Sequence, residues 1–277
     1  MASEDEFRVM QVEVRDGVLE AVIDNPPINL ITRDLYRDLV QLVDFADAAP
    51  DARVLVLRSA NPDFFIAHYD VESILTFPID SPAERSDELN TFHQLCERLR
   101  TMPIPTICEI GGRVGGGGGE LAASCDMRFG AKGNTTLCQM EVPLGILPGG
   151  TGTQRLPRLV GRGRAMEIVL SGDDIDAETL EAWGWLNRAV APGDLHAHVA
   201  ALATRLASMP PEAVSRAKAA VLAATPDPTP GLLEEAFLFQ ETVRSDAAQT
   251  RMRNFLDRGG QTVDGEKRVG ALGAELG

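Results

Sequence analysis

Glycine is concentrated in one part of this chain to a degree that restricts how the chain can fold. Thirteen of the 26 glycines lie between residues 111 and 152, and five of them are consecutive, Gly115 to Gly119. Because glycine lacks a Cβ atom, such a segment lets the backbone approach another segment or a ligand closely. The run follows an apolar stretch over residues 105–110 and precedes a short apolar segment that starts near Glu120. We therefore expect a strand, a glycine loop and a helix N-terminus, in that order.

Several functions fit a glycine loop before a helix, because unpaired N–H groups and the helix dipole attract negative charge there. A nucleotide-binding P-loop requires Gly-Lys-Ser/Thr after the loop, whereas Glu120 follows here and would repel a phosphate. The dinucleotide pattern also fails, because counting from Gly115 and Gly117 places Glu120 at its third glycine. An oxyanion hole beside an acid uses both the N–H groups and the carboxylate. A loop that needs glycine only in order to turn is the structural alternative.

A second carboxylate, Glu141, lies 21 residues after Glu120, in the segment QMEVPLGILPGGTGTQRL. It too precedes a glycine-rich turn and a helix start. Taken alone, Glu141 is best interpreted as a solvated surface group. Two acids beside two helix N-termini, however, fit general acid/base catalysis.

The rest of the chain alternates between predicted strands and helices, which is typical of the α/β class. Asp16-Gly17, a hairpin turn signal, joins two N-terminal strands. Thr32 can cap a helix whose apolar residues recur at three- and four-residue spacing through Val43. The further expectations are buried strands over 53–59, 105–110 and 126–131, an irregular segment over 61–81, a helix over 82–100, a turn and short strand over 183–190, and mainly helices after Gly161.

Composition excludes several classes of partner. With 41 acidic and 26 basic residues the formal net charge is −15, which repels phosphates, so we expect neither nucleic acid nor a membrane as partner. No apolar run approaches the ~20 residues of a membrane span, and the acidic start MASEDEFRVM is unlike a secretory or organellar targeting segment. We therefore expect a cytoplasmic protein. The four cysteines and four histidines lack the spacing of metal ligands, so we expect no metal site.

The segments GGGGGELAASCD and EVPLGILPGGTGTQRL, in this order and at this separation, resemble the crotonase (enoyl-CoA hydratase/isomerase) superfamily. The resemblance covers about residues 7–257. It implies an α/β fold, a right-handed crotonase-like spiral of repeated ββα units with a C-terminal helical region, usually assembled as trimers or dimers of trimers. We accordingly expect a spiral core with the active site over 1–195, a helical trimerisation region over 196–257 and a frayed tail over 258–277.

The resemblance also implies a catalytic site. Glu120 and Glu141 match the two catalytic glutamates of the hydratases, and Gly149 matches the glycine whose N–H helps to hold the water. Gly117 matches the glycine whose N–H forms half of an oxyanion hole for a thioester carbonyl.

The other half of the oxyanion hole comes from the loop FIAHYD, residues 65–70, which resembles the family's F-x-A-G-A-D loop. This match assigns the Tyr69 N–H as the second donor and Ala67 as the position whose carbonyl meets the adenine of CoA. His68 stands where the family most often has glycine. As a candidate modulator it alters the loop geometry or places a titratable group beside the thioester; the alternative is a histidine that packs against or caps the loop.

Because both glutamates are present, we expect a lyase of fatty acid metabolism that hydrates a trans-2-enoyl-CoA to a 3-hydroxyacyl-CoA. One carboxylate would take a proton from the attacking water and one carboxyl would protonate the α-carbon, while the two backbone donors stabilise the enolate. One of the two must be neutral, so their pKa values should be split. Coenzyme A enters only as part of the acyl-CoA substrate, and we expect no other cofactor. The assembly implied is a homotrimer or homohexamer.

Other functions stay open at this point. An enoyl-CoA isomerase or another enolate-forming acyl-CoA enzyme shares the oxyanion hole and needs one base, and a crotonase-fold scaffold needs no turnover. The sequence argues against a Clp-type serine peptidase, because Ser124 has no plausible partners in the order that such an enzyme needs. Residues that the acyl pocket would use, and that core packing explains equally well, are Ile28, Ile66, Ile74, Leu75, Phe77 and Val142.

Overall fold

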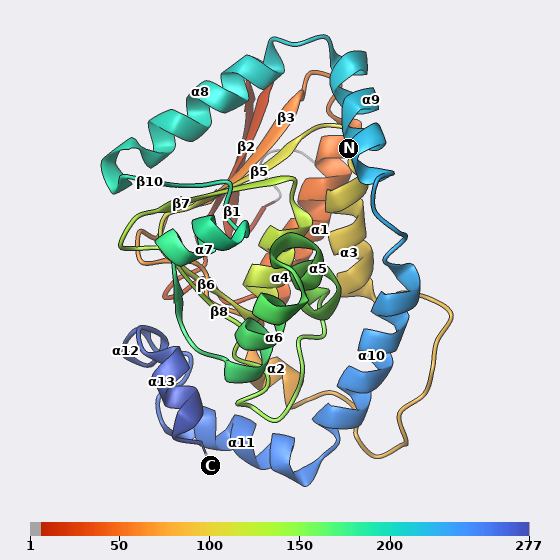
Figure 1. Cartoon of the computed structure of the whole chain (residues 1–277), viewed down its shortest axis with the longest axis vertical. Coiled ribbons are helices and arrows are strands. Elements are labelled where there is room, and N and C mark those ends of the chain that lie inside the picture. Colours follow the sequence, from red (N-terminus) through yellow and green to blue (C-terminus); the bar gives the residue numbers. More distant parts are fainter. Residues whose placement is uncertain (1–6, 277) are drawn as a thin grey trace.

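The computed structural model describes residues 7–276, and its strands form two sheets (Figure 1). The six-stranded sheet contains, in spatial order, β1 (Met10–Arg15), β2 (Val18–Ile23), β3 (Val54–Ser59), β5 (Thr106–Ile110), β7 (Met127–Ala131) and β10 (Arg188–Val190). The four-stranded sheet contains β4 (Phe64–Ile66), β6 (Arg113–Gly115), β8 (Thr136–Cys138) and β9 (Ile175–Asp176). All neighbours in the larger sheet are parallel except β1 and β2.

From β3 to β8, successive strands alternate between the two sheets, which gives this part of the chain the course of a spiral. β3, β5 and β7 are parallel neighbours in the larger sheet, and the strands that follow them, β4, β6 and β8, are parallel neighbours in the smaller one. Helices follow each pair: α2 (Val71–Ile74) and α3 (Thr91–Thr101) after β4, α4 (Gly116–Ser124) after β6, and α5 (Gly152–Val160) after β8. The expected spiral of ββα units with a helical C-terminus is confirmed.

Helices cover both faces of the larger sheet. Val54 and Val56 of β3 pack in the cluster that holds α8 (Leu195–Ala207), whereas Leu55 and Leu57 join the main core with α1 (Arg33–Ala48). Successive side chains of a strand point to opposite faces, so this strand is buried on both, as its continuous apolar run predicted. The domain boundary that we placed after residue 195 therefore falls within a helix that packs on the spiral sheet.

The N-terminal hairpin and α1 form as the sequence predicts. Asp16 and Gly17 have φ values of 51° and 82°, and positive φ at both central residues is what the two-residue turn favouring Asp-Gly requires. The Thr32 side chain accepts a hydrogen bond from the Leu35 N–H and caps α1.

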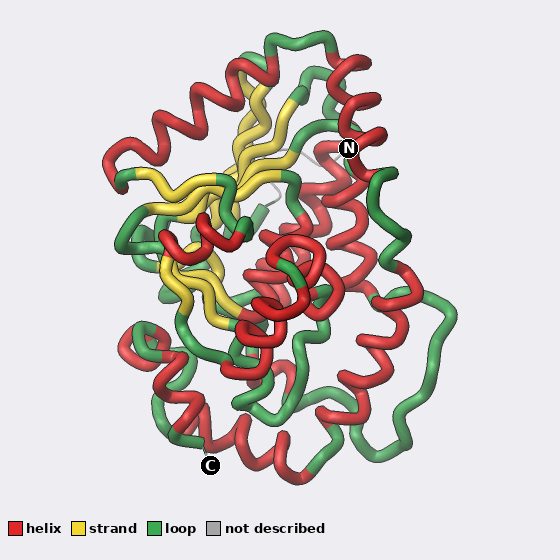
Figure 2. The backbone as a smooth tube through the Cα atoms, in the orientation of Figure 1, coloured by secondary structure: helices red, strands yellow, loops and turns green. Residues whose placement is uncertain are grey.

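The C-terminal helices form an arm, residues 211–276, that runs down one side of the molecule and returns beneath the spiral (Figure 2). Val243, Phe255 and Leu272 of the arm pack with Ile74 of α2 and Met140 of the loop after β8. The arm contains α9 (Pro211–Leu222), α10 (Thr229–Val243), α11 (Asp246–Asp257), α12 (Val263–Glu266) and α13 (Val269–Ala274). Between α5 and α8 lie α6 (Arg162–Ser171), α7 (Ala177–Trp183) and the 3-10 helix η2 (Pro192–Asp194).

Two segments differ from the expectation for the region before β5. Residues 61–81 are not irregular throughout, because they contain β4 and α2. The helix expected over 82–100 begins only at Thr91, because the Asn90 side chain accepts the His93 N–H at 2.8 Å and caps the helix there. The residues before it form a loop that an Arg85–Glu234 ion pair ties to α10.

The tail also differs from the frayed segment that we expected. It contains the short helices α12 and α13, and Leu272 and Leu276 are fully buried. Together with Val269 they recur at three- and four-residue spacing and form an apolar stripe that packs on the rest of the arm.

Candidate active site

The five consecutive glycines form the junction between β6 and α4. The helix begins at Gly116, four residues before the start that we expected near Glu120. Gly116 has a φ of +41°, which residues with side chains rarely adopt. A Cβ atom on Gly118 would lie 2.5 Å from the carbonyl oxygen of Ile66. Glycine is therefore required here because β4 lies directly against the first turn of α4.

The amides of Gly117 and Tyr69 lie together at the N-terminus of α4. A parallel bridge between Ile31 and Tyr69 aligns the 65–70 loop, with the Ile31 N–H donating to the His68 carbonyl at 2.9 Å. A Cβ atom on Gly117 would lie 3.5 Å from the Tyr69 nitrogen. Among residues 7–276, neither of these two amides donates a hydrogen bond. The structure thus places the two predicted donors close to each other at the start of α4.

Glu120 projects from α4 one turn after Gly117 and is held by the N-terminus of α5. Its Oε1 accepts hydrogen bonds from the amides of Gly150 and Gly152, at 2.8 and 2.7 Å, and the side chain is buried. Burial raises the pKa of this carboxyl well above its usual value, and the charges of Glu141 and Glu235 raise it further. The hydrogen bonds from the two amides lower the pKa, but by less than burial and the neighbouring charges raise it. Glu120 is therefore suited to hold a proton at neutral pH, on the oxygen that the amides leave free.

Glu141 lies in the loop that follows β8 and is also buried. The Gln139 side-chain amide donates to its Oε2 at 3.3 Å. Burial raises the pKa of Glu141 to about 7, with the charge of His68 opposing the rise and that of Glu235 adding to it. Both carboxyl pKa values are raised, Glu141's to near neutrality. The pair can therefore present one carboxyl and one carboxylate together, as acid/base catalysis requires.

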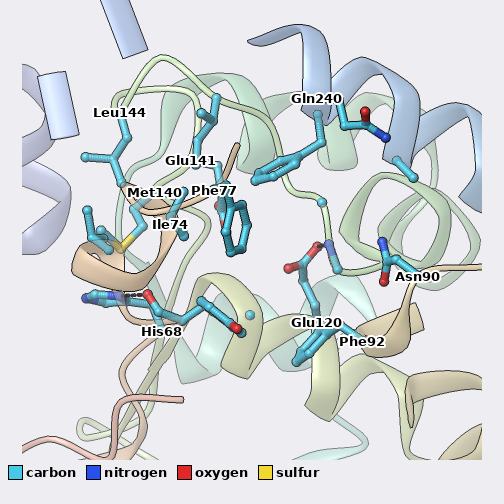
Figure 3. Close-up of a pocket in the computed structure, with 18 of the residues that line it drawn as sticks. His68, Ile74, Phe77, Asn90, Phe92, Glu120, Met140, Glu141, Leu144 and Gln240 are labelled. Atoms are coloured by element: carbon cyan, nitrogen blue, oxygen red, sulfur yellow. Dashed lines mark hydrogen bonds between the residues drawn. The ribbon is translucent and has the colours of Figure 1, made fainter. Parts of the chain in front are cut away.

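Both glutamates border a single cavity of about 330 Å³ (Figure 3). Tyr69, Gly117 and Gly149 border it as well, and so does His68. Away from these groups the wall is mostly apolar and draws on the spiral and on the C-terminal arm. The apolar lining residues are Tyr36, Val71, Ile74, Phe77, Phe92, Met140, Leu144, Ile146, Ala236 and Phe239.

Some residues singled out in the sequence lie elsewhere. Ala67 does not border the cavity; it is buried with Ile28 and Phe64, and its carbonyl oxygen faces Gly115. Of the six residues suggested for an acyl pocket, only Ile74 and Phe77 line the cavity. The other four do not line the cavity, because they pack in the core or point away from the cavity: Ile28, Ile66, Leu75 and Val142.

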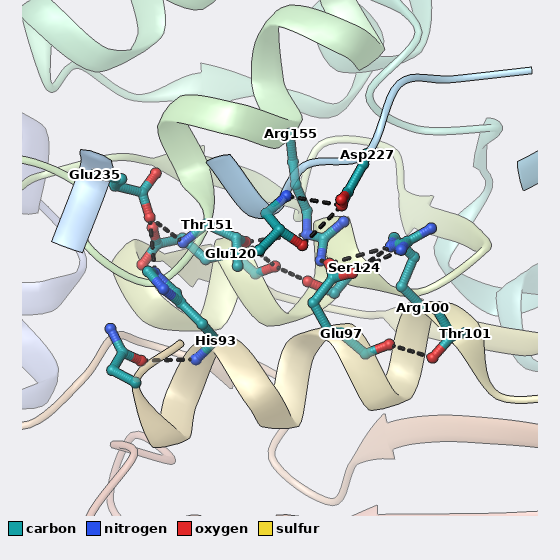
Figure 4. Close-up of polar contacts among 12 residues, drawn as sticks. His93, Glu97, Arg100, Thr101, Glu120, Ser124, Thr151, Arg155, Asp227 and Glu235 are labelled. Carbon is teal, nitrogen blue, oxygen red and sulfur yellow. Dashed lines mark hydrogen bonds and ion pairs between the residues drawn. The ribbon is translucent and has the colours of Figure 1, made fainter. Parts of the chain in front are cut away.

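The sequence analysis missed a further buried carboxylate near Glu120, Glu235 of α10, which lies beside Thr151 and His93 (Figure 4). It accepts hydrogen bonds from the amides of Thr151 and Thr153 at 2.7 and 2.9 Å, and it pairs with His93 at 3.0 Å. Four consecutive amides at the start of α5 are thus bound alternately by Glu120 and Glu235. A signal was present in the sequence, since Glu235 falls between Leu232 and Val243 on the buried side of a helix, where a lone acid is unusual.

Arg155 belongs to the same buried network. Its guanidinium pairs with Glu97 at 2.6 Å and donates to the Thr151 hydroxyl at 3.1 Å. Within residues 7–276, no cluster of three or more histidine, cysteine or acidic side chains is arranged to hold a metal ion. In the same part of the chain, no helix is long and apolar enough to cross a membrane.

Comparisons with known proteins find similar chains and folds. The family model described as enoyl-CoA hydratase/isomerase matches residues 13–265. The chain is 32% identical to a probable mitochondrial enoyl-CoA hydratase of Arabidopsis thaliana, over 74% of this chain and 67% of that protein. It is 30% identical to a probable enoyl-CoA hydratase of Mycobacterium leprae, over 83% and 88%. A crystal structure of a putative enoyl-CoA hydratase from Streptomyces avermitilis superposes with a TM-score of 0.88 at 35% identity, covering 98% of each chain.

Proposed function

This chain belongs to the enoyl-CoA hydratase/isomerase family, and on that premise we propose that it is a lyase that hydrates a trans-2-enoyl-CoA to a 3-hydroxyacyl-CoA. The observation that carries the proposal is the shared cavity. Glu120, Glu141 and the amides of Tyr69 and Gly117 all border it. An isomerase needs one base, whereas addition of water needs a base for the water and an acid for the α-carbon.

The roles follow from how each group is held. The thioester oxygen accepts hydrogen bonds from the Tyr69 and Gly117 amides, which stabilise the enolate as negative charge moves onto that oxygen. The Glu141 carboxylate takes a proton from water while the water oxygen bonds to the β-carbon. The Glu120 carboxyl gives its proton to the α-carbon, and its negative charge is then held by the Gly150 and Gly152 amides. A proton passing from Glu141 to Glu120 resets the site.

No further cofactor is needed for this reaction, because water and the two carboxyl groups account for every proton transferred. CoA enters as part of the substrate. The contact proposed between the Ala67 carbonyl and the CoA adenine stays a prediction.

We also propose self-association as a homotrimer or homohexamer. α9 buries none of its residues within one chain, and Val221 on it is 72% exposed. On α6, Met166 and Leu170 are 54% and 60% exposed. Met166 and Leu170 lie one helical turn apart, and a contiguous apolar patch of this kind marks a contact site between proteins. Light scattering tests this: a particle of three or six times 29.8 kDa supports the proposal and a monomer contradicts it.

The reaction is tested with a panel of straight, branched and aromatic trans-2-enoyl-CoAs. We expect loss of the conjugated thioester absorbance and a product heavier by one water for at least one member of the panel. Migration of the double bond with no gain of mass would show that the protein is an isomerase and not a hydratase. Tight binding of acyl-CoA without any conversion would show that the protein is a non-catalytic scaffold.

A further inference from the structure

Five aromatic side chains border the cavity that holds the two carboxyl groups, and they come from five separate segments of the chain. They are Tyr36 of α1, Tyr69 of the loop after β4, Phe77 of the loop after α2, Phe92 of α3 and Phe239 of α10. Aromatic residues make up only 5% of the chain. Both of its tyrosines and three of its ten phenylalanines therefore meet at one site.

The five rings form a continuous series of contacts along the cavity wall. Tyr36 stacks on Phe92 with ring centroids 6.3 Å apart, and Phe92 meets Tyr69 edge to face at 6.0 Å. Tyr69 continues to Phe77 at 6.5 Å, and Phe77 to Phe239 at 6.4 Å. Aromatic rings attract one another at such separations. The rings thus make one aromatic wall.

Each ring of this wall keeps part of its surface uncovered, unlike the aromatic residues of the core. Phe64, Phe65, Phe255 and Trp185 are fully buried by neighbouring protein atoms. All five cavity residues, by contrast, are half-buried. A half-buried ring on the wall of a cavity offers its free face or edge to a ligand.

Two of the rings lie close to the backbone that holds the Glu120 carboxyl. Cε1 of Phe92 and Oε2 of Glu120 both lie 2.6 Å from the position that a Cβ atom on Gly150 would occupy. Figure 3 shows Phe92 next to Glu120. A Cβ atom on Gly149 would lie 2.5 Å from Cδ2 of Phe239. A substituent on the β-carbon of the substrate, which reacts beside these carboxyl groups, would therefore meet ring edges at once.

The size of the cavity limits the acyl group. Its volume of about 330 Å³ is roughly twice the ~150 Å³ of an apolar cavity that holds one benzene molecule. At the same volume per carbon, the cavity has room for about a dozen carbon atoms. A phenyl ring on a three-carbon enoyl group fits within that limit, whereas the tail of a long-chain fatty acid exceeds it.

A ring gains more from this wall than a saturated chain with the same number of carbon atoms. A substrate ring can meet the cavity rings edge to face, and each such contact is worth about two- to tenfold in affinity beyond the burial of apolar area. The ring also has a single rotatable bond to the enoyl group, whereas a saturated tail has several that binding must freeze. The cavity should therefore favour the ring.

We propose that the acyl group is an arylpropenoyl group, a three-carbon enoyl with an aromatic ring on its β-carbon, and that Phe92 and Phe239 determine this specificity. The inference rests on the proposed hydratase function, whose substrate class it narrows. Water adds across the double bond, with its hydroxyl bonding to the ring-bearing β-carbon and a hydrogen to the α-carbon. The reverse reaction releases the same water and restores the double bond.

The kinetic test runs in the direction of dehydration, because conjugation of the double bond with the ring opposes hydration. It compares 3-hydroxy-3-phenylpropanoyl-CoA with 3-hydroxynonanoyl-CoA, whose acyl groups have the same number of carbon atoms. The appearance of the conjugated thioester absorbance measures both rates. We expect kcat/KM to be about tenfold higher for the aromatic substrate, from one or two edge-to-face contacts. An equal or higher kcat/KM for the linear substrate would overturn the inference.

Two variants test the residues that the inference names. Phe92→Leu and Phe239→Leu keep an apolar side chain but remove the ring, so each should lower the ratio of aromatic to linear kcat/KM by about two- to tenfold. The matched control is Phe237→Leu on the same α10. The Phe237 ring lies 4.1 Å from the guanidinium carbon of Arg85 and does not border the cavity, so the ratio should stay unchanged. A ratio that also stays unchanged in both cavity variants would contradict the role of the rings.

A binding measurement separates this inference from the hydratase proposal. The saturated thioesters 3-phenylpropanoyl-CoA and nonanoyl-CoA have no double bond to hydrate, and calorimetry gives their dissociation constants without turnover. We expect the aromatic thioester to bind about tenfold more tightly. That result without conversion of either hydroxyacyl-CoA would support the aromatic site and refute the hydratase. Equal or weaker binding, with conversion of the linear substrate, would refute this inference and leave the hydratase in place.

Discussion

The two carboxyl groups of the cavity are held by different kinds of contact. Glu120 rests on the backbone of the spiral, with one oxygen bound by the Gly150 and Gly152 amides. Glu141 depends on side chains: the Gln139 amide donates to it, and His68 faces it across Gly116. His68 is held in turn by Glu266 from the end of the chain.

The site therefore has a Glu120 half and a Glu141 half, each consisting of one carboxyl group and its contacts. The kind of contact determines what substitution or a change of pH can alter in each half. Backbone amides keep their position and charge whatever the pH, so the Glu120 half has fixed geometry. Of the side-chain partners of Glu141, His68 can titrate, and each can be replaced one at a time, so the Glu141 half has adjustable charge. The two halves should therefore respond differently to substitution and to pH.

The largest expected effect comes from removing either carboxyl. Glu120→Gln and Glu141→Gln should each lower kcat by about 10³-fold, which is typical for loss of a general acid or base. Steady-state kinetics on the best substrate of the panel measure this, with Glu212→Gln on the exposed side of α9 as the control. A variant that kept most of its activity would show that its carboxyl takes no part in the reaction.

Next in size is the loss of one oxyanion donor. Gly117→Pro removes the N–H and should lower kcat by about 10²-fold, in line with other oxyanion holes. Gly117→Ala keeps the N–H and adds a methyl group 3.3 Å from the Cβ of Tyr69, so it measures the steric contribution alone. Equal losses in the two variants would mean that crowding, and not the missing hydrogen bond, causes the effect.

The pH profile distinguishes the two halves without any substitution. The base must be ionised, so activity should fall as the pH drops through about 7, where burial places the pKa of Glu141, and then tenfold for each further unit. The acid must be protonated, so activity should also fall at a pH above the raised pKa of Glu120. Activity that stays constant from pH 5 to pH 7 would exclude Glu141 as the base.

The smallest effect is expected at Glu235, whose carboxylate binds the Thr151 and Thr153 amides, the Thr153 hydroxyl and His93. Its charge raises the pKa of Glu120, so Glu235→Gln should move the alkaline limb to lower pH and change the maximal kcat by less than about tenfold. The adjacent, exposed Glu234 gives the matched control Glu234→Gln. If both variants leave the alkaline limb in place, Glu235 only anchors α10 to α5.

The elements that could be predicted from sequence are those with local signals. The hairpin at Asp16-Gly17, the cap at Thr32 and the apolar run of β3 each encode their structure within a few neighbouring residues. By contrast β4, β6, β8 and β9 are two or three residues long, too short to show an alternating pattern.

The candidate site divides in the same way. Glu120 and Gly117 could be placed because the glycine run marks a helix N-terminus and the resemblance supplies their roles. The sequence marks Glu235 as an unusual acid on a buried helix face, but it does not show what Glu235 or Glu266 binds, since each meets its partners only when the arm folds back onto the spiral. His68 was identified as unusual, but nothing in the sequence near it indicates the carboxylate that it meets.

The most direct test of two-carboxyl hydration is the reaction of a trans-2-enoyl-CoA in heavy water, followed by NMR of the product. The account predicts a 3-hydroxyacyl-CoA with one deuterium on the α-carbon, formed by wild type and lost in both Glu120→Gln and Glu141→Gln. Deuterium in the acyl chain without a hydroxyl group on the β-carbon, or hydration that persists in either variant, would contradict it.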